Sequence, residues 1–201
     1  TPASLLLDAM DATTGWTNVL QGLTSLNSTT YKEGSGALNV YKTATDGLYP
    51  LAYKNLSTSY NLTSKDVWVW VYIKDTTTLN KLAEIRYYLN STPNYYYHYS
   101  FTSLSVGWNM IGKNAASYDG KFGTPNISAI NKIQIGAKTN NHSDTLAEGD
   151  LIFDFMRVEG TSSDNSIIQA SDLSGNGNHG TLYGGTFQAS PHRLRRGVLV
   201  S

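Results

Sequence analysis

A run of alternating aliphatic and aromatic side chains constrains the fold of this chain more than any other feature. The run is Asp66–Ile73, in which the two kinds of residue take turns: Val67, Val69, Val71 and Ile73 against Trp68, Trp70 and Tyr72. Because successive side chains of a β-strand point to opposite faces of the sheet, this strand has an aliphatic face and an aromatic face. The pattern therefore predicts a central strand, with one face on a core and the other either covered or shaped to hold a ligand.

Other short apolar segments are separated by turns rich in Gly, Asp and Asn, as is typical of β-strands. We expect strands at residues 5–10, 37–43, 48–55, 81–89, 95–101, 108–113, 130–138 and 151–158. No stretch of a dozen residues keeps a helical period of 3.6. The spacing predicts an all-β fold, a two-sheet antiparallel β-sandwich of the jelly-roll kind, that ends near residue 160.

Composition excludes several classes of function. The 201 residues include 15 Lys and Arg and 15 Asp and Glu, so the formal net charge is zero, which argues against a nucleic-acid partner. No run of 18 apolar residues occurs, which argues against membrane insertion. Because the chain has no cysteine, disulfides, thiol catalysis and thiolate metal sites are excluded.

Aromatic residues gather on two expected strands joined by the turn at 91–94: Tyr87, Tyr88, Tyr95, Tyr96, Tyr97, Tyr99 and Phe101. Sugar rings stack on exposed aromatic rings, while hydroxyl, amide and imidazole groups bond their hydroxyls. A platform for a polysaccharide or glycan is expected in one of two forms. Either Tyr96 and His98 build it, or the opposite row does, beside the aromatic face of the 66–73 strand: Tyr95, Tyr97 and Tyr99 with Trp68, Trp70 and Tyr72. The alternative for each ring is a place in the core.

A resemblance to a known group of domains rests on five short motifs: Asp8-Ala-Met-Asp11, Gly15-Trp16, Lys32-Glu-Gly-Ser-Gly-Ala-Leu38, Gly107-Trp108-Asn109 and Ile152-Phe153-Asp154. In this order and spacing, residues 1–160 resemble the galactose-binding-like and carbohydrate-binding jelly rolls appended to secreted glycosidases and to phage or archaeal surface proteins. The resemblance implies a ligand-binding module but identifies no ligand, because such folds also serve as spacers.

The same resemblance implies a structural calcium ion at the sheet edge. The matching positions are Asp11 or Asp8, the loop around Glu33, and Asp154. Carboxylates and loop carbonyls are suitable calcium ligands. Asp154 lies among apolar residues, where an unpaired carboxylate is costly, so it needs a metal, an arginine or several hydrogen-bond donors. The alternative is that Asp154 pairs with a basic residue or backbone amides and that Asp8 and Asp11 only shape a turn.

The C-terminal part differs in composition from the rest. Residues 161–171 are rich in Ser, Asp and Asn and are expected to form a linker. The segment Asp172-Leu-Ser-Gly-Asn-Gly-Asn-His-Gly-Thr181 resembles the opening strand of a laminin-G or concanavalin-A-like lectin domain. Residues 172–201 are too few for such a domain, so we expect a piece of a longer modular protein or a truncated product, and no lectin site is inferred from it.

Three function classes remain open. The first is a non-catalytic extracellular module for carbohydrate binding or surface adhesion, and the second is a structural module of a virion, filament or surface layer that contacts neighbouring modules or copies of itself. The third is a polysaccharide lyase of sandwich fold, for which only His98 with its tyrosine neighbours and Arg86 has suitable groups. A glycosidase is disfavoured, because no strand carries the alternating carboxylates of sandwich glucanases.

Overall fold

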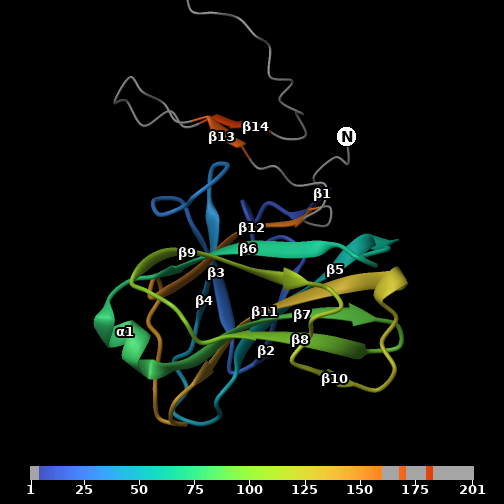
Figure 1. The fold of residues 1–201 in the computed structure, drawn as a ribbon. Coiled ribbons are helices and arrows are strands. Elements are labelled where there is room, and N and C mark those ends of the chain that lie inside the picture. Colours follow the sequence, from blue (N-terminus) through green and yellow to red (C-terminus); the bar gives the residue numbers. More distant parts are fainter. Residues whose placement is uncertain (1–4, 160–167, 171–179, 183–201) are drawn as a thin grey trace, which may run out of the picture.

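The computed structural model describes residues 5–159, 168–170 and 180–182. Two six-stranded sheets lie face to face in residues 5–159 (Figure 1). The pairings within both sheets are antiparallel. The expected all-β sandwich is thus confirmed, and its topology decides which aromatic residues share a surface.

The first layer, named the β6 sheet here, has the strand order β3-β4-β12-β6-β9, with β1 also paired to β12. Its strands are β1 (Leu5–Asp8), β3 (Leu23–Asn27), β4 (Ala37–Tyr41), β6 (Asp66–Ile73), β9 (Gly107–Asn114) and β12 (Leu151–Glu159). Strand β6 lies between β12 and β9, which confirms its expected central position.

The second layer, named the β7 sheet, has the order β10-β8-β7-β11-β5-β2. Its strands are β2 (Trp16–Leu20), β5 (Pro50–Tyr60), β7 (Leu82–Ser91), β8 (Tyr95–Phe101), β10 (Gly120–Phe122) and β11 (Ile130–Thr139). Strands β7 and β8 form the expected hairpin. The short strands β2, β3 and β10 were not predicted, because none carries an apolar run long enough to stand out from its turns.

The core lies between the two layers. From β6 it takes Val67, Val69, Val71 and Ile73, none of which is more than 1% exposed, whereas Trp68, Trp70 and Tyr72 are half-buried on the other face. The opposite layer supplies the alternate apolar residues of β7 and β11: Ile85, Tyr87, Leu89, Ile133, Ile135 and Ala137. The period of two in these strands therefore separates a core face from an outer face in both sheets.

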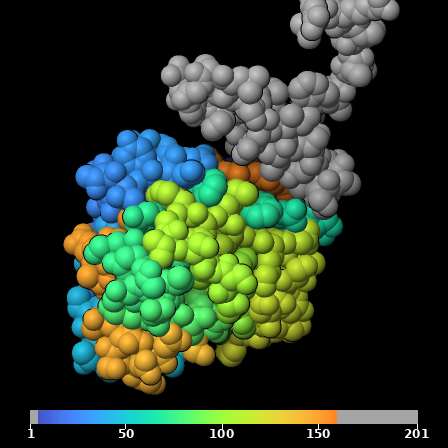
Figure 2. Space-filling view, turned by 60° about the vertical axis from the view of Figure 1, so that its left-hand side comes forward, coloured from blue at the N-terminus to red at the C-terminus, as the bar shows by residue number. Residues whose placement is uncertain are grey.

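A short helix and a 3-10 turn complete the sandwich. Helix α1 (Thr76–Lys81) begins at Asp75, whose carboxylate accepts a hydrogen bond from the Thr78 backbone N–H at 2.7 Å. The Lys81 ammonium donates to the Thr145 carbonyl at 2.8 Å, which ties α1 to the loop before β12 (Figure 2, green beside orange). The 3-10 turn η1 (Ile127–Ala129) precedes β11. No helix in the described residues has the length and apolar character needed to span a bilayer.

Beyond residue 159 the structure describes only two short strands. They are β13 (Ile168–Ala170) and β14 (Gly180–Leu182), which pair with each other in antiparallel register. The remainder of the expected linker at 161–171 and of the lectin-like segment at 172–201 lies outside the described residues. Both remain predictions.

Candidate functional site

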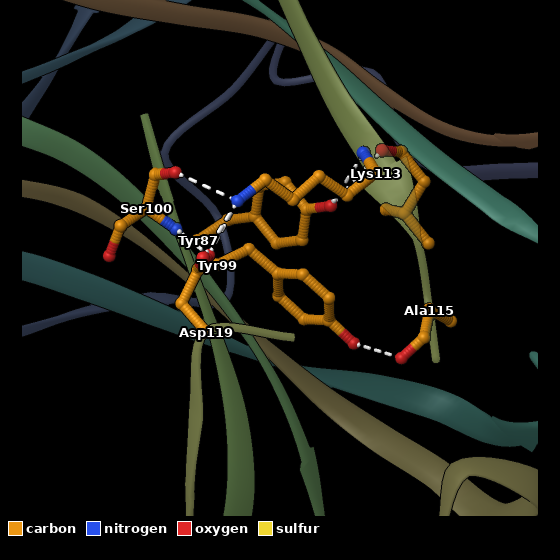
Figure 3. Close-up of polar contacts among 7 residues, drawn as sticks. Tyr87, Tyr99, Ser100, Lys113, Ala115 and Asp119 are labelled. Carbon is orange, nitrogen blue, oxygen red and sulfur yellow. Dashed lines mark hydrogen bonds and ion pairs between the residues drawn. The ribbon is translucent and has the colours of Figure 1, made fainter. Parts of the chain in front are cut away.

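Strand β8 divides its aromatic residues between the core and the outer surface. Tyr99 is fully buried, its ring stacks on Tyr87 at 4.6 Å between centroids, and its hydroxyl donates to the Ala115 carbonyl at 2.6 Å (Figure 3). Tyr97 packs against this core and donates its hydroxyl to the Pro125 carbonyl at 2.7 Å. Because side chains alternate, Tyr96 and His98 lie on the outer face of the β7 sheet.

One of the expected ligand-binding residues of β8 lies in the core. The expectation that Tyr99 contacts a ligand fails, because no part of its side chain is exposed. Tyr95 and Tyr97 are half-buried, and Tyr97 is occupied by the loop at Pro125. Tyr96 and His98 are also half-buried, but they lie on the outer face of the β7 sheet, away from the core.

A groove of about 420 Å³ runs over the outer face of the β7 sheet. Its lining comes from β2, β5, β7, β8, β11 and the segment before β5: Val19, Leu20, Tyr49, Leu51, Arg86, Tyr88, Tyr96 and Gln134. Three of these eight residues are tyrosines, and Arg86 adds a planar guanidinium group. Three others are aliphatic, and Gln134 contributes an amide. This mixture of flat apolar faces and a few hydrogen-bonding groups suits a polyhydroxylated ring.

The rings on this face support one another. Tyr88 meets Tyr96 edge to face with centroids 5.3 Å apart, and Tyr96 stacks on Phe122 of β10 at 5.6 Å. His98 lies next to the groove, 6.0 Å from Tyr88 between ring centroids. Gly120 is directly opposite His98, and a β-carbon there would come within 2.3 Å of the imidazole, so glycine lets β10 pack closely at this edge. The rings on this face are therefore held in place by one another and by the close packing of β10.

Arg86 supplies the polar centre of the groove. Its guanidinium is paired with Glu84, donates to the Tyr88 hydroxyl at 3.3 Å, and lies 5.2 Å from the Tyr49 ring centroid. Its buried Nε has no hydrogen-bond partner within the protein. Burial raises the pKa of Tyr88, so its hydroxyl stays protonated. Burial and, after it, the Arg86 charge lower the pKa of His98, so its imidazole is neutral near pH 7.

The tryptophan row lies on the other side of the molecule. The β6 sheet carries Trp68, Trp70 and Tyr72, whereas β8 belongs to the β7 sheet. The two aromatic groups therefore do not form the single platform that the sequence predicted. The Trp70 indole donates to Glu33 at 2.9 Å, and the Lys32 ammonium lies 4.9 Å from its ring centroid. Trp70 is thus partly covered by the loop before β4. Tyr72 packs against Trp108 at 5.3 Å.

The four expected calcium ligands do not all converge. One Asp8 carboxylate oxygen pairs with Lys54 at 2.5 Å, and the other accepts from the Met10 backbone N–H at 2.8 Å. Glu33 turns toward Trp70 and Arg157. Within the described part of the chain, no three Asp, Glu or His side chains cluster as metal ligands would. Asp8 and Glu33 are therefore held by protein partners.

Asp154 and Asp11 remain close to the same loop. Asp154 is fully buried, and its Oδ2 accepts from the backbone N–H groups of Lys32 and Glu33 at 2.6 and 2.9 Å, whereas its Oδ1 has no hydrogen-bond partner. Asp11 accepts from the N–H groups of Ser35 and Gly36, both at 2.8 Å. Burial raises the pKa of Asp154 to about 6 despite its two backbone bonds, and the charges of Asp11 and Glu33 add to the shift.

Sequence reasoning missed most of the groove. Tyr49 and Gln134 were not singled out, and Phe122 lies on a strand that was not predicted. The alternation in β11 carries a usable signal, because Lys132, Gln134 and Gly136 interleave with the buried Ile133 and Ile135. That period marks Gln134 as outward-facing.

Comparison with known proteins gives the fold but no family. No protein-family model and no curated protein matches the chain. Among solved structures, a family 11 carbohydrate-binding module from Clostridium thermocellum, in complex with a β-1,3-1,4-mixed-linked tetrasaccharide, has a TM-score of 0.58 and 16% identity over 79% of this chain and 96% of that chain. An exo-β-agarase has a TM-score of 0.54 and 13% identity over 80% of this chain and 25% of that chain. Residues 5–159 therefore have the jelly-roll fold of carbohydrate-binding modules.

Proposed function

We propose that this chain is a non-catalytic carbohydrate-binding module that binds a polysaccharide in the groove on the outer face of the β7 sheet. The observation that carries the proposal is the set of preorganised rings around Arg86, with Tyr88 and Tyr96 fixed edge to face. Rings held in this way bind a sugar without the entropic cost of ordering them. The fold shared with carbohydrate-binding modules supports this role, and an extracellular location is part of the proposal.

Affinity electrophoresis on gels that contain soluble neutral and acidic polysaccharides tests this function. Tyr96→Ala removes a ring from the groove and is expected to weaken binding at least tenfold, which corresponds to about 1.4 kcal/mol. Tyr72→Ala is the matched control, because it removes a half-buried tyrosine from the outer face of the other sheet. Loss of binding in Tyr72→Ala with retention in Tyr96→Ala would move the site to the tryptophan row.

Two other functions remain as outcomes of the same experiment. If the wild-type protein binds no polysaccharide in the panel, the favoured hypothesis is a structural module that contacts copies of itself or neighbouring modules. A lyase is favoured by one observation, that His98, Tyr88 and Arg86 lie on the same face. However, the raised pKa of Tyr88 makes it a poor base near neutral pH. Release of unsaturated products from a uronate polymer, lost in His98→Ala, would establish the lyase.

We further propose a structural calcium ion near Asp154. The unpartnered Oδ1 of Asp154, close to the negative charge of Asp11, is the observation that supports it. These two carboxylates with main-chain carbonyls and water would make up an oxygen ligand set. The ion would offset the repulsion between the two acidic groups and tie the loop before β4 to β12. Asp8 and Glu33 are not part of this proposal, because their oxygens are taken by protein partners.

A further inference from the structure

A second cavity adjoins the groove on the same sheet. It measures about 270 Å³ and is lined mainly by amides and hydroxyls from β5, β11 and the β7–β8 turn: Asn55, Leu56, Ser91, Thr92, Pro93, Asn94, Asn131 and Lys132. Lys132 of this cavity and Gln134 of the groove lie on one face of β11, two residues apart, which is about 7 Å. One extended chain lying across the sheet therefore reaches both.

Asn90 lies between one residue of each cavity and itself lines neither. It is opposite Lys132 of β11 on one side and Tyr96 of β8 on the other, so its side chain shares their face. Only 5% of Asn90 is exposed, and its Oδ1 has no hydrogen-bond partner within the protein. A buried carbonyl oxygen without a donor is costly.

The charged side chains that line these two cavities are both cations. The combined lining contains Arg86 and Lys132 but no Asp or Glu. Arg86 is paired with Glu84, which lies two residues earlier on the same face of β7, so the Arg86 charge is already compensated. The Lys132 ammonium donates to the Asn94 side-chain oxygen at 2.9 Å and lies 4.8 Å from the Tyr53 ring centroid, and within residues 5–159 no carboxylate forms an ion pair with it. Covering this cation with a neutral sugar gives no compensating charge.

We propose that the ligand of this module is an acidic polysaccharide and that its anionic group, a carboxylate or a sulfate ester, binds Lys132 in the second cavity. This assignment rests on the proposed polysaccharide-binding function of the groove. Neutral parts of the polysaccharide would then pack against Tyr96 in the groove. The anion would replace part of the hydration of Lys132 in a half-buried position, where an ion pair is stronger than at the open surface.

The test uses pairs of polymers that differ only in charge. Polygalacturonate is compared with its methyl ester, and a sulfated galactan with the same galactan after desulfation, by calorimetry on the full chain at low salt. The wild-type protein is expected to bind the acidic member of at least one pair about tenfold more tightly, with an advantage that shrinks as NaCl is added. The pair that shows the difference identifies the anionic group.

Two variants then assign that advantage to Lys132. Lys132→Gln is expected to bind the acidic and neutral polymers equally. Lys138→Gln, on the same strand and face but lining neither cavity, is expected to keep the advantage. Equal binding of both members of each pair by the wild type, or an undiminished advantage in Lys132→Gln, overturns the proposal. If the proposal is overturned in this way but Tyr96→Ala still loses polymer binding, the proposed polysaccharide-binding function is retained. If the wild-type protein binds no polymer at all, the polysaccharide-binding function and the acidic ligand are both overturned.

Discussion

Replacement of Tyr99 by alanine is expected to lower the free energy of unfolding by about 3–5 kcal/mol, because it removes a large buried aromatic side chain and leaves a cavity between the sheets. The Tyr99 ring is fully buried and stacks on Tyr87, whose hydroxyl accepts from the Lys113 backbone N–H at 3.2 Å. Chemical denaturation monitored by circular dichroism measures the loss.

The surroundings of Tyr99 explain why this loss is hard to absorb. The Lys113 ammonium pairs with Asp119 at 2.7 Å and donates to the Ser100 carbonyl at 3.1 Å, and the Ser100 backbone N–H donates to Asp119 at 2.7 Å (Figure 3). These contacts join β9 of one sheet to β8 of the other around the two stacked tyrosines. A cavity at Tyr99 therefore weakens the contact between the layers.

Two further variants separate packing from hydrogen bonding. Tyr99→Phe keeps the ring but leaves the Ala115 carbonyl without its hydroxyl donor, and a loss of about 1–3 kcal/mol is expected. Tyr96→Ala, three residues away on the outer face, is expected to cost less than 1 kcal/mol because it empties a groove and not the core. A Tyr99→Ala protein as stable as Tyr96→Ala would contradict the inward orientation of the odd-numbered row.

Without calcium, Asp154→Asn is expected to be more stable than the wild type at pH 8, by up to about 3 kcal/mol. The folded protein raises the pKa of Asp154 from 3.8 to about 6, so between pH 4 and pH 6 the folded state holds a proton that the unfolded state has released. Wild-type stability therefore falls as the pH rises through this window. In Asp154→Asn the fall is absent, and the amide oxygen still accepts from Lys32 and Glu33.

Calcium should reverse that order if the proposed ion binds. Millimolar calcium is expected to raise the melting temperature of the wild type at pH 8 and to leave that of Asp154→Asn unchanged, since a ligand stabilises only the state that binds it. Asp8→Asn serves as a control for a carboxylate that is paired with Lys54. If neither calcium nor a chelator changes the melting temperature of the wild type, the proposed calcium ion is wrong. Asp154 is then only a buried acidic residue with a raised pKa.

The sequence predicted the fold class and the position of β6 because both depend on local periodicity. Alternation places Val67 and Val69 inward without knowledge of any other strand. It is ambiguous for β8, where both rows are aromatic and either row is apolar enough for the core. The choice is made by distant contacts, such as the bond from Tyr99 to Ala115 and the packing of Tyr87.

The candidate site was harder to predict for the same reason. Strand β11 lies between β7 and β5, so Gln134 meets Tyr88 only through a sheet order that local patterns do not determine. The aromatic face of β6 was a reasonable expectation, but Trp70 is engaged by Lys32 and Glu33 from a loop whose path depends on the buried Asp154.

Consecutive residues of β8 lie on opposite faces of the β7 sheet. Natural selection can therefore act on the outer-face residues and on the core-facing residues independently. Changes at Tyr96 or His98 alter the outer face, where we propose that the ligand binds, and leave the contact between the two sheets intact. Changes at Tyr97 or Tyr99 instead remove contacts to the core and to the segments at Pro125 and Ala115. Homologous proteins with this arrangement can thus diverge in their preferred ligand while they keep the same fold, even where little sequence identity remains.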